Sequence, residues 1–339
     1  MTEKHEPHVP HEHSDPTISE IKKEGVSELH AHAVAGPPPR EEAGPLGGTS
    51  RTLWGDAWYR LRRNKLALAA LVWILIVAIA AITADLWVPQ NFGDPRTIDT
   101  QAAATQRLLP PQPGHPFGTD DLGRDIFGRV IYGARVSLTV GVIATAIAVL
   151  IGVALGALSG YYGRWTDSVI MRTTDIFLAF PYILFSILIL AVVPPDQRGI
   201  WPVIAAIGFL GWPTFARLFR SSVLSVKEND YIDAGRALGA SDARLLFRHI
   251  TPNAIAPVVV YATMSIGGAI LSEAALSFLG LGVQPPAISW GRMIDDGRAF
   301  LTIAPTVVLF PGLAILSTVL AFTLLGDGVR DALDVKMKD

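Results

Sequence analysis

The chain alternates between long uncharged apolar runs and short segments that carry nearly all of its charge. A helix needs about 20 apolar residues to cross the hydrocarbon core of a bilayer, and six runs have roughly that length. We therefore predict an all-α polytopic membrane protein with six transmembrane helices. The six predicted spans are 66–84, 136–163, 176–195, 199–216, 250–272 and 299–326.

A seventh uncharged run, 274–291, contains Gly280, Gly282, Pro285 and Pro286. These residues favour an irregular backbone, which would expose unpaired N–H and C=O groups to lipid. We interpret this run as the end of the fifth span followed by a re-entrant or outer loop.

The first 50 residues differ in composition from the rest of the chain. They are rich in His, Glu, Pro and Gly and poor in aliphatic residues, which predicts a disordered cytoplasmic tail, 1–50. Six of the eight histidines lie there, but no spacing among them fixes a tetrahedral metal site, and we predict none.

The rest of the chain is expected to form two further parts. They are 51–135, with the first span, an outer loop and an interfacial helix, and 136–335, the permease core.

An amphipathic stretch precedes the second span. It has apolar side chains on one helical face and charged side chains on the other, which predicts an interfacial helix along the outer membrane surface. The apolar positions are Leu122, Ile126, Phe127, Val130 and Ile131, and the charged ones are Asp121, Arg124, Asp125 and Arg129.

Lys and Arg are about twice as frequent on the span flanks that lie on the same side of the membrane as the N-terminus. This bias predicts that both termini are cytoplasmic.

Composition excludes several functional classes. Half of the residues are hydrophobic and 17% are charged, which is typical of a membrane protein and not of a soluble domain. The absence of cysteine removes disulfides and thiolate chemistry, and no basic patch with interleaved aromatics indicates nucleic-acid binding. The chain also lacks G-x-x-x-x-G-K-[ST], H-E-x-x-H and G-x-S-x-G. We therefore predict no enzyme activity and no cofactor in this chain.

The charged segment between the fourth and fifth spans, 227–252, predicts two short helices. Asn229 or Asp230 can cap the first helix, and Gly239 can supply the left-handed residue that ends it. Ser241 can cap the second helix. Pro252 suits the first turn of the fifth span. A helical knob is therefore expected to protrude from the membrane.

The first of these helices combines two kinds of surface. Ala234, Ala237 and Leu238 offer small and apolar side chains, while Asp233 and Arg236 stay solvated. Such a mixture suits a docking surface for a partner protein. From these residues alone, a solvated loop without a partner fits equally well.

Two patterns lie within the spans themselves. Gly152, Gly156 and Gly160 recur at every fourth residue of the second span, which lets another helix approach closely. Glu273 lies near the outer end of the fifth span, where an ionisable side chain needs water or a partner. It fits a residue that lines a gate, or a carboxylate that emerges at the interface or is satisfied by a neighbouring helix.

The string DAGRALG followed by ITP resembles the EAA signature of ABC importer permeases. In that family the signature forms a coupling helix, which lies in a groove of the ATPase subunit and transmits its nucleotide-driven closure. The resemblance implies an ABC importer type I permease fold and coupling roles for residues of the first short helix. These residues are Asp233, Ala234, Arg236, Ala237 and Gly239. Residues 227–252 are called the coupling segment below.

The match to this signature is incomplete at three places. Asp233 replaces the usual Glu, Gly235 replaces the second Ala, and Thr251 stands where Leu is usual. Glycine at position 235 loosens the helix by about 1 kcal/mol relative to alanine.

Two more strings, HPFGTDDLGRDIFGRVIYGARVSL and LSEAALSFLGLGVQPPAISWG, resemble the C-type permeases of the dipeptide, oligopeptide and nickel group. The resemblance covers roughly residues 60–335. It implies a second, B-type permease, two ATP-binding subunits or domains that hold ATP and Mg²⁺, and an extracytoplasmic substrate-binding protein.

The implied function is ATP-driven import of di- or oligopeptides across the bacterial cytoplasmic membrane, and nickel or another small solute stays open. A self-sufficient secondary transporter would carry ionisable residues or broken helices at mid-membrane, whereas the charges here gather at the span ends. A membrane enzyme is disfavoured by the missing motifs.

Overall fold

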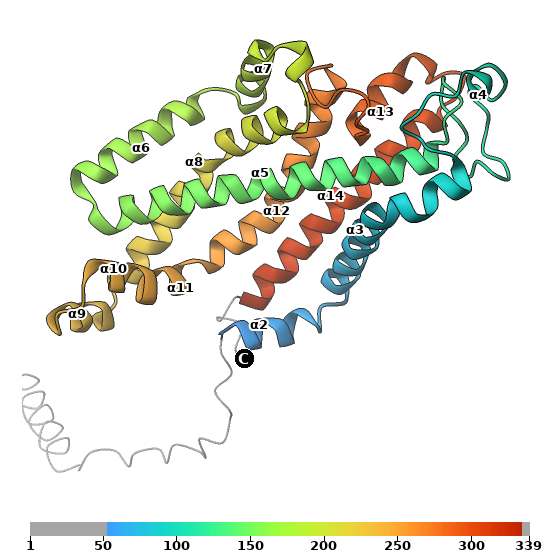
Figure 1. Cartoon of the computed structure of the whole chain (residues 1–339). Helices are drawn as coiled ribbons and strands as arrows, with labels where there is room; N and C mark the ends of the chain where they lie inside the picture. Colours follow the sequence, from blue (N-terminus) through green and yellow to red (C-terminus); the bar gives the residue numbers. More distant parts are fainter. Residues whose placement is uncertain (1–52, 334–339) are drawn as a thin grey trace, which may run out of the picture. The chain divides into compact units, whose positions relative to one another are not determined.

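The computed structural model describes residues 53–333, and every regular element of these residues is a helix (Figure 1). The predicted tail 1–50 lies outside the described residues. Five helices are long and apolar enough to cross a membrane. They are α3 (Lys65–Phe92), α5 (Ile126–Tyr162), α8 (Ile200–Lys227), α12 (Ala256–Phe278) and α14 (Thr306–Leu333). A sixth span exists if the bent pair α6 (Arg164–Ala179) and α7 (Tyr182–Val192) is counted as one.

Shorter helices lie between these spans or at their ends. They are α2 (Leu53–Leu61), α4 (Thr100–Thr105), α9 (Asp230–Ala237), α10 (Asp242–Arg244), α11 (Thr251–Ala254) and α13 (Trp290–Gly297). Two 3₁₀ turns, η1 (Pro195–Gln197) and η3 (Arg298–Phe300), and one π-helix, η2 (Leu245–Ile250), complete the regular elements of the described chain.

The prediction of apolar spans is confirmed, but the third span is bent. The run predicted as one helix, 176–195, combines the end of α6 with α7, and the two helices meet at 85°. Phe180 at this corner has an extended backbone, with φ −94° and ψ 136°. Because Pro181 follows it, the helical region is disfavoured at position 180, and the chain turns there.

The stretch predicted as an interfacial helix does not form a helix of its own. Instead, α5 begins at Ile126 and continues without a break through the predicted second span, for 37 residues or about 55 Å. Asp125 caps it, because its carboxylate accepts the N–H of Gly128 at 2.7 Å. Leu122 precedes the helix. Nothing in the sequence after Asp125 stops the helix. The small residues of α5 serve in packing against other elements. A Cβ at Gly133, for example, would lie 2.9 Å from the Trp290 ring.

Small residues also bring α5 and α8 together. A Cβ at Gly156 would lie 2.6 Å from the backbone oxygen of Ala216, and one at Gly160 would lie 2.9 Å from Cβ of Val223. Gly152 approaches the backbone of α8 in the same way. Real Cβ atoms cannot come so close, so the glycines set the spacing of the two helices.

An apolar face of α3 is left uncovered by the rest of the described chain. Its exposed side chains are Leu75, Ile76, Ile79, Ile82 and Leu86. A contiguous apolar surface of this kind is unusual in a soluble monomer and fits contact with lipid or another membrane subunit.

The chain after α12 follows the expectation for the seventh uncharged run. The helix ends at Phe278, and residues 279–289 form an irregular loop that leads into α13. Gly280 has a φ of +76° and begins the turn out of α12.

Candidate coupling segment, cavity and outer cluster

The coupling segment has the local structure that its glycine and serine predict. Gly239 has a φ of +82°, and its N–H donates to the carbonyl of Arg236 at 3.0 Å. A Cβ there would meet nothing within 4 Å, so glycine is needed for its backbone conformation and not for space. Ser241 caps α10 by accepting the N–H of Arg244 at 3.4 Å. Asn229 occupies the cap position of α9, but its amide donates back to carbonyls of the last turn of α8.

The five residues expected to couple to a partner are all exposed in the described chain. They are Asp233, Ala234, Arg236, Ala237 and Gly239. Two large apolar side chains accompany them, since Leu238 is 89% exposed and Phe247 is 71% exposed. Arg236 donates to Asp233 at 2.9 Å. Exposed apolar groups beside solvated charges give this surface the composition of a protein interface.

The underside of α9 is held by buried apolar contacts. Ile232 is fully buried in a cluster with Leu245 and Ile250 of the π-helix and with Phe219 and Val223 of α8. The coupling segment is therefore packed on the end of α8.

Polar contacts join the coupling segment to the end of α5. The hydroxyl of Tyr161 donates to Asp242 Oδ1 at 2.7 Å. Lys227, the last residue of α8, donates to the carbonyl of Tyr161 at 2.5 Å. Displacement of the segment would therefore act on both α5 and α8.

The fifth span begins later than predicted. The π-helix Leu245–Ile250 leads into α11, and α12 starts only at Ala256. Pro252 and Pro257 lie in the first turns of α11 and α12. Because proline has no N–H to donate, each removes a hydrogen bond that a continuous helix would need.

A cavity of about 460 Å³ lies between α5, α7, α8 and α12, with Leu178 of α6 at its edge. Among the described residues, no carboxylate, imidazole or cationic side chain lines it. Its lining hydroxyls are Thr145, Tyr182, Thr214, Tyr261, Ser265 and Ser272. Ser265 and Ser272 donate their protons to carbonyls of their own helix, at 2.8 and 2.9 Å. Their remaining lone pairs can accept hydrogen bonds, so this surface is neutral and weakly polar.

Glu273 does not line this cavity, contrary to a gate-lining position. Its side chain is fully buried and accepts hydrogen bonds from Ser137 of α5 at 3.1 Å and from Ser277 at 2.7 Å. Ser277 Oγ also accepts the N–H of Val283 and lies 3.4 Å from Ser289 Oγ. The hydroxyl donors offset part of the cost of burying the carboxylate. This matches the alternative that a neighbouring helix satisfies Glu273.

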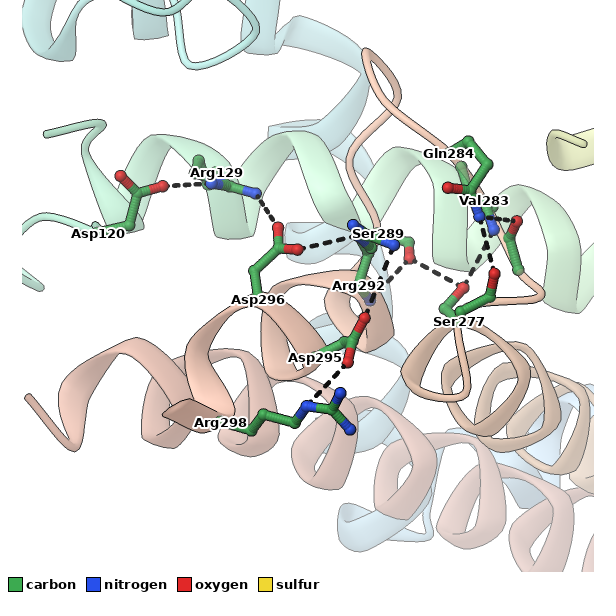
Figure 2. A network of polar contacts seen from close by, with 12 residues as sticks. Asp120, Arg129, Ser277, Val283, Gln284, Ser289, Arg292, Asp295, Asp296 and Arg298 are labelled. Atoms are coloured by element: carbon green, nitrogen blue, oxygen red, sulfur yellow. Dashed lines mark hydrogen bonds and ion pairs between the residues drawn. The ribbon is translucent and has the colours of Figure 1, made fainter. Parts of the chain in front are cut away.

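Charged side chains at the N-terminal end of α5 form an ionic cluster with α13 (Figure 2). Asp120 pairs with Arg129 and, at 2.8 Å, with Arg124. Arg129 also lies 3.4 Å from Asp296. The rest of the cluster consists of the pairs Arg292–Asp295, Arg292–Asp296 and Arg298–Asp295. The cluster joins the loop before α5 to the helix after α12, and Figure 2 shows it meeting the serine contacts at Ser289 and Arg292.

Burial dominates the electrostatics of the loop before α5. It raises the pKa of Asp125, although the N–H of Gly128 and the His115 ring, 3.0 Å away, favour the ionised form. Burial also raises the pKa of Asp121 and lowers that of Arg124. Desolvation penalises each charged form. The charged forms in this loop are therefore stabilised mainly by ion pairs with neighbouring side chains.

Sequence reasoning missed the joining role of two aromatic residues. Trp290 donates from Nε1 to the carbonyl of Val130 at 2.8 Å and so fixes α13 to α5. Tyr161 joins α5 to the coupling segment. Trp290 lies within one of the recognised strings, but no periodicity reveals a partner 160 residues away.

Comparison with known proteins defines the class of this chain. Residues 152–339 match the family described as binding-protein-dependent transport system inner membrane component. Residues 52–111 match the N-terminal TM domain of oligopeptide transport permease C. The chain belongs to this family of ABC importer permeases. Within the family it is a C-type permease of the dipeptide and oligopeptide group, and it is a transport subunit, not an enzyme.

Relatives match over most of their length. The dipeptide transport permease DppC of Alkalihalophilus pseudofirmus is 43% identical over 94% of this chain and 100% of its own. The glutathione transport permease GsiD of Pectobacterium atrosepticum is 42% identical over 85% of this chain and 93% of its own. That of Shigella dysenteriae is 46% identical over 85% and 92%.

A solved structure shares the fold. It is an inward-facing conformation of the MetNI methionine ABC transporter, with a TM-score of 0.50 and 19% identity over 60% of this chain and 96% of that chain. The likeness supports the permease fold and carries no information about the transported solute.

Proposed function

We propose that this chain forms one half of the translocation path of an importer for di- or oligopeptides, and that its coupling segment docks on the ATPase. The observation that carries the proposal is the exposed surface of α9. The buried side of α9 belongs to an apolar cluster that includes residues of α8, the helix that also lines the cavity. A partner that moved this surface would move the cavity lining with it.

The chemistry of the cavity supports a peptide in preference to a metal ion. Its hydroxyls and apolar side chains suit a neutral or zwitterionic solute that moves past without tight binding. Nickel binding favours imidazole or similar ligands, and the cavity lining has none. The dipeptide and glutathione permeases among the relatives point the same way.

The proposed assembly follows the resemblance to this family. A B-type permease would complete the path, two ATP-binding subunits would hold ATP and Mg²⁺, and a binding protein would deliver the peptide. Both termini would be cytoplasmic, which places the coupling segment on the ATPase side and the ionic cluster on the outer side. ATP and binding-protein docking would then favour opposite facings of one path.

Uptake by the complete complex in proteoliposomes tests the substrate class. We expect a labelled dipeptide to be imported with ATP, unlabelled di- and oligopeptides to compete, and Ni²⁺ not to compete. Ni²⁺ import without peptide import would overturn the peptide assignment and leave the permease class intact.

The absence of cysteine gives a direct test of orientation. Single cysteines at Gly93 and Ser241 would be labelled in intact cells with a membrane-impermeant reagent. We expect labelling at position 93 and none at 241. The reverse pattern would overturn the proposed orientation.

A further inference from the structure

Helix α2 lies immediately before the first span and is only partly covered by the chain. Figure 1 shows it at the ends of α3 and α14, and it packs against α14. Ala57 is buried, and a Cβ at Gly328 would lie 3.3 Å from Cδ1 of Leu61. The opposite face is open, since Trp58 is 48% exposed and Tyr59 is 44% exposed.

Positive charge is concentrated where α2 meets α3. Arg60, Arg62, Arg63 and Lys65 fall within six residues, and no acidic residue follows until position 85. Within residues 53–333, neither of the exposed arginines 62 and 63 nor Lys65 forms an ion pair with a carboxylate. Arg62, Arg63 and Lys65 therefore carry positive charge that no carboxylate of the described chain neutralises.

The two exposed arginines are stacked on the two exposed aromatic rings. The guanidinium of Arg62 lies 4.7 Å from the centre of the Trp58 ring, and that of Arg63 lies 4.4 Å from the centre of the Tyr59 ring. Arg63 also donates to the Tyr59 hydroxyl. Stacking limits the freedom of both guanidinium groups, and their N–H groups can bind a phosphate through paired hydrogen bonds.

An excess of Lys and Arg beside a span sets membrane orientation, but orientation alone does not need stacked aromatic pairs. Tryptophan and tyrosine are typical of the membrane–water interface, and a basic cluster beside a span attracts anionic lipids. We propose that Trp58, Tyr59, Arg62, Arg63 and Lys65 form a binding site for the phosphate headgroup of an anionic phospholipid of the cytoplasmic leaflet. The choice of leaflet rests on the proposed orientation.

Lipid retention by the complete transporter tests this site. The complex would be reconstituted in nanodiscs with equal amounts of phosphatidylglycerol and phosphatidylcholine, and the lipids that remain after extraction into detergent would be quantified by mass spectrometry. We expect the wild type to retain phosphatidylglycerol preferentially. The variant Arg62→Gln/Arg63→Gln should lose this preference by roughly 25-fold, because each of the two cations near an anionic surface adds about fivefold in affinity.

Two further variants separate the site from a general charge effect. Arg164→Gln/Arg172→Gln removes two exposed arginines of α6, and it should retain phosphatidylglycerol like the wild type. Arg62→Lys/Arg63→Lys keeps the charge and removes the planar groups, and it should lose part of the preference. Yields of the assembled complex show whether each variant folds.

Several outcomes would overturn the proposal. They are unchanged retention in the Arg62→Gln/Arg63→Gln variant, equal loss in the α6 control, unchanged retention in the lysine variant, and displacement of the lipid by inorganic phosphate. The cysteine labelling at positions 93 and 241 is read separately. Reversed labelling with preserved lipid retention would refute the orientation and the choice of leaflet. It would leave the proposed headgroup-binding site supported.

Discussion

Charged side chains are buried at one end of α5 and exposed at the other. At its N-terminal end, Asp120 and Arg129 pair with almost no solvent access. Beyond its C-terminus, Asp233 and Arg236 form a similar pair at 2.9 Å, with side chains that are 69% and 49% exposed. One helix thus connects a closed ionic cluster to the exposed surface that we propose for docking.

The difference shows that the same kind of ion pair has two uses. A buried pair is costly to break, because removal of one partner leaves the other charge desolvated. An exposed pair adds little to stability, and its groups remain available to a second protein. We therefore expect substitutions in the ionic cluster to act on folding, and substitutions in the coupling segment to act on assembly and coupling.

The largest effect is expected for Arg129→Met. It leaves the buried Asp120 without its closest partner, which should cost about 3–5 kcal/mol and lower the unfolding temperature of the purified complex. Arg107→Lys, at an exposed position of the same loop, should leave that temperature unchanged. An Arg129→Met complex as stable as the wild type would refute the structural role of the cluster.

Gly156→Leu tests the close contact between α5 and α8. The new side chain would collide with the backbone of α8 at Ala216, and the overpacking should cost about 1–3 kcal/mol. Gly312→Leu on α14 is a matched control, because a Cβ there meets nothing within 4 Å. Differential scanning fluorimetry would compare them. Equal loss of stability in both would show that the loss at position 156 does not come from this contact.

Gly239→Val should affect the exposed coupling segment in a different way. A β-branched residue at a φ of +82° costs roughly 1–2 kcal/mol and shifts the end of α9. We expect the complex to form and to hydrolyse ATP, with loss of uptake and of the response to the binding protein. Gly239→Asn should restore much of the coupling, since Asn tolerates this conformation. Wild-type uptake by the valine variant would contradict the coupling role.

Asp233→Lys should have the smallest effect on stability, below about 1 kcal/mol, because its pair with Arg236 is exposed. Its expected effect is on assembly, since it reverses a charge on the proposed docking surface. The amount of ATPase that co-purifies with the permease measures this. Unchanged stoichiometry and unchanged uptake would remove Asp233 from the interface.

Hydropathy predicted the spans because the need for a long apolar run is local. It did not predict the bend at Phe180, which depends on Pro181, or the length of α5. An amphipathic start to a helix has the same pattern whether the helix lies on the membrane or enters it. The positive φ of Gly239 was predictable from local turn chemistry. The contacts of Arg129 and Trp290 were not, since they join residues more than 150 positions apart.

The π-helix Leu245–Ile250 gives the connection between α9 and α12 a particular rotational phase. A π-helix accommodates one residue more than an α-helix along nearly the same path, and such a surplus is equivalent to a single inserted amino acid. Because each residue of an α-helix turns the chain by about 100°, loss of that residue would rotate everything before it by roughly this angle. The side of α9 that faces the solvent is therefore set by chain length within η2 as well as by the burial of Ile232. Relatives with a shorter segment at this point would present a different side of α9, even where the signature residues are identical.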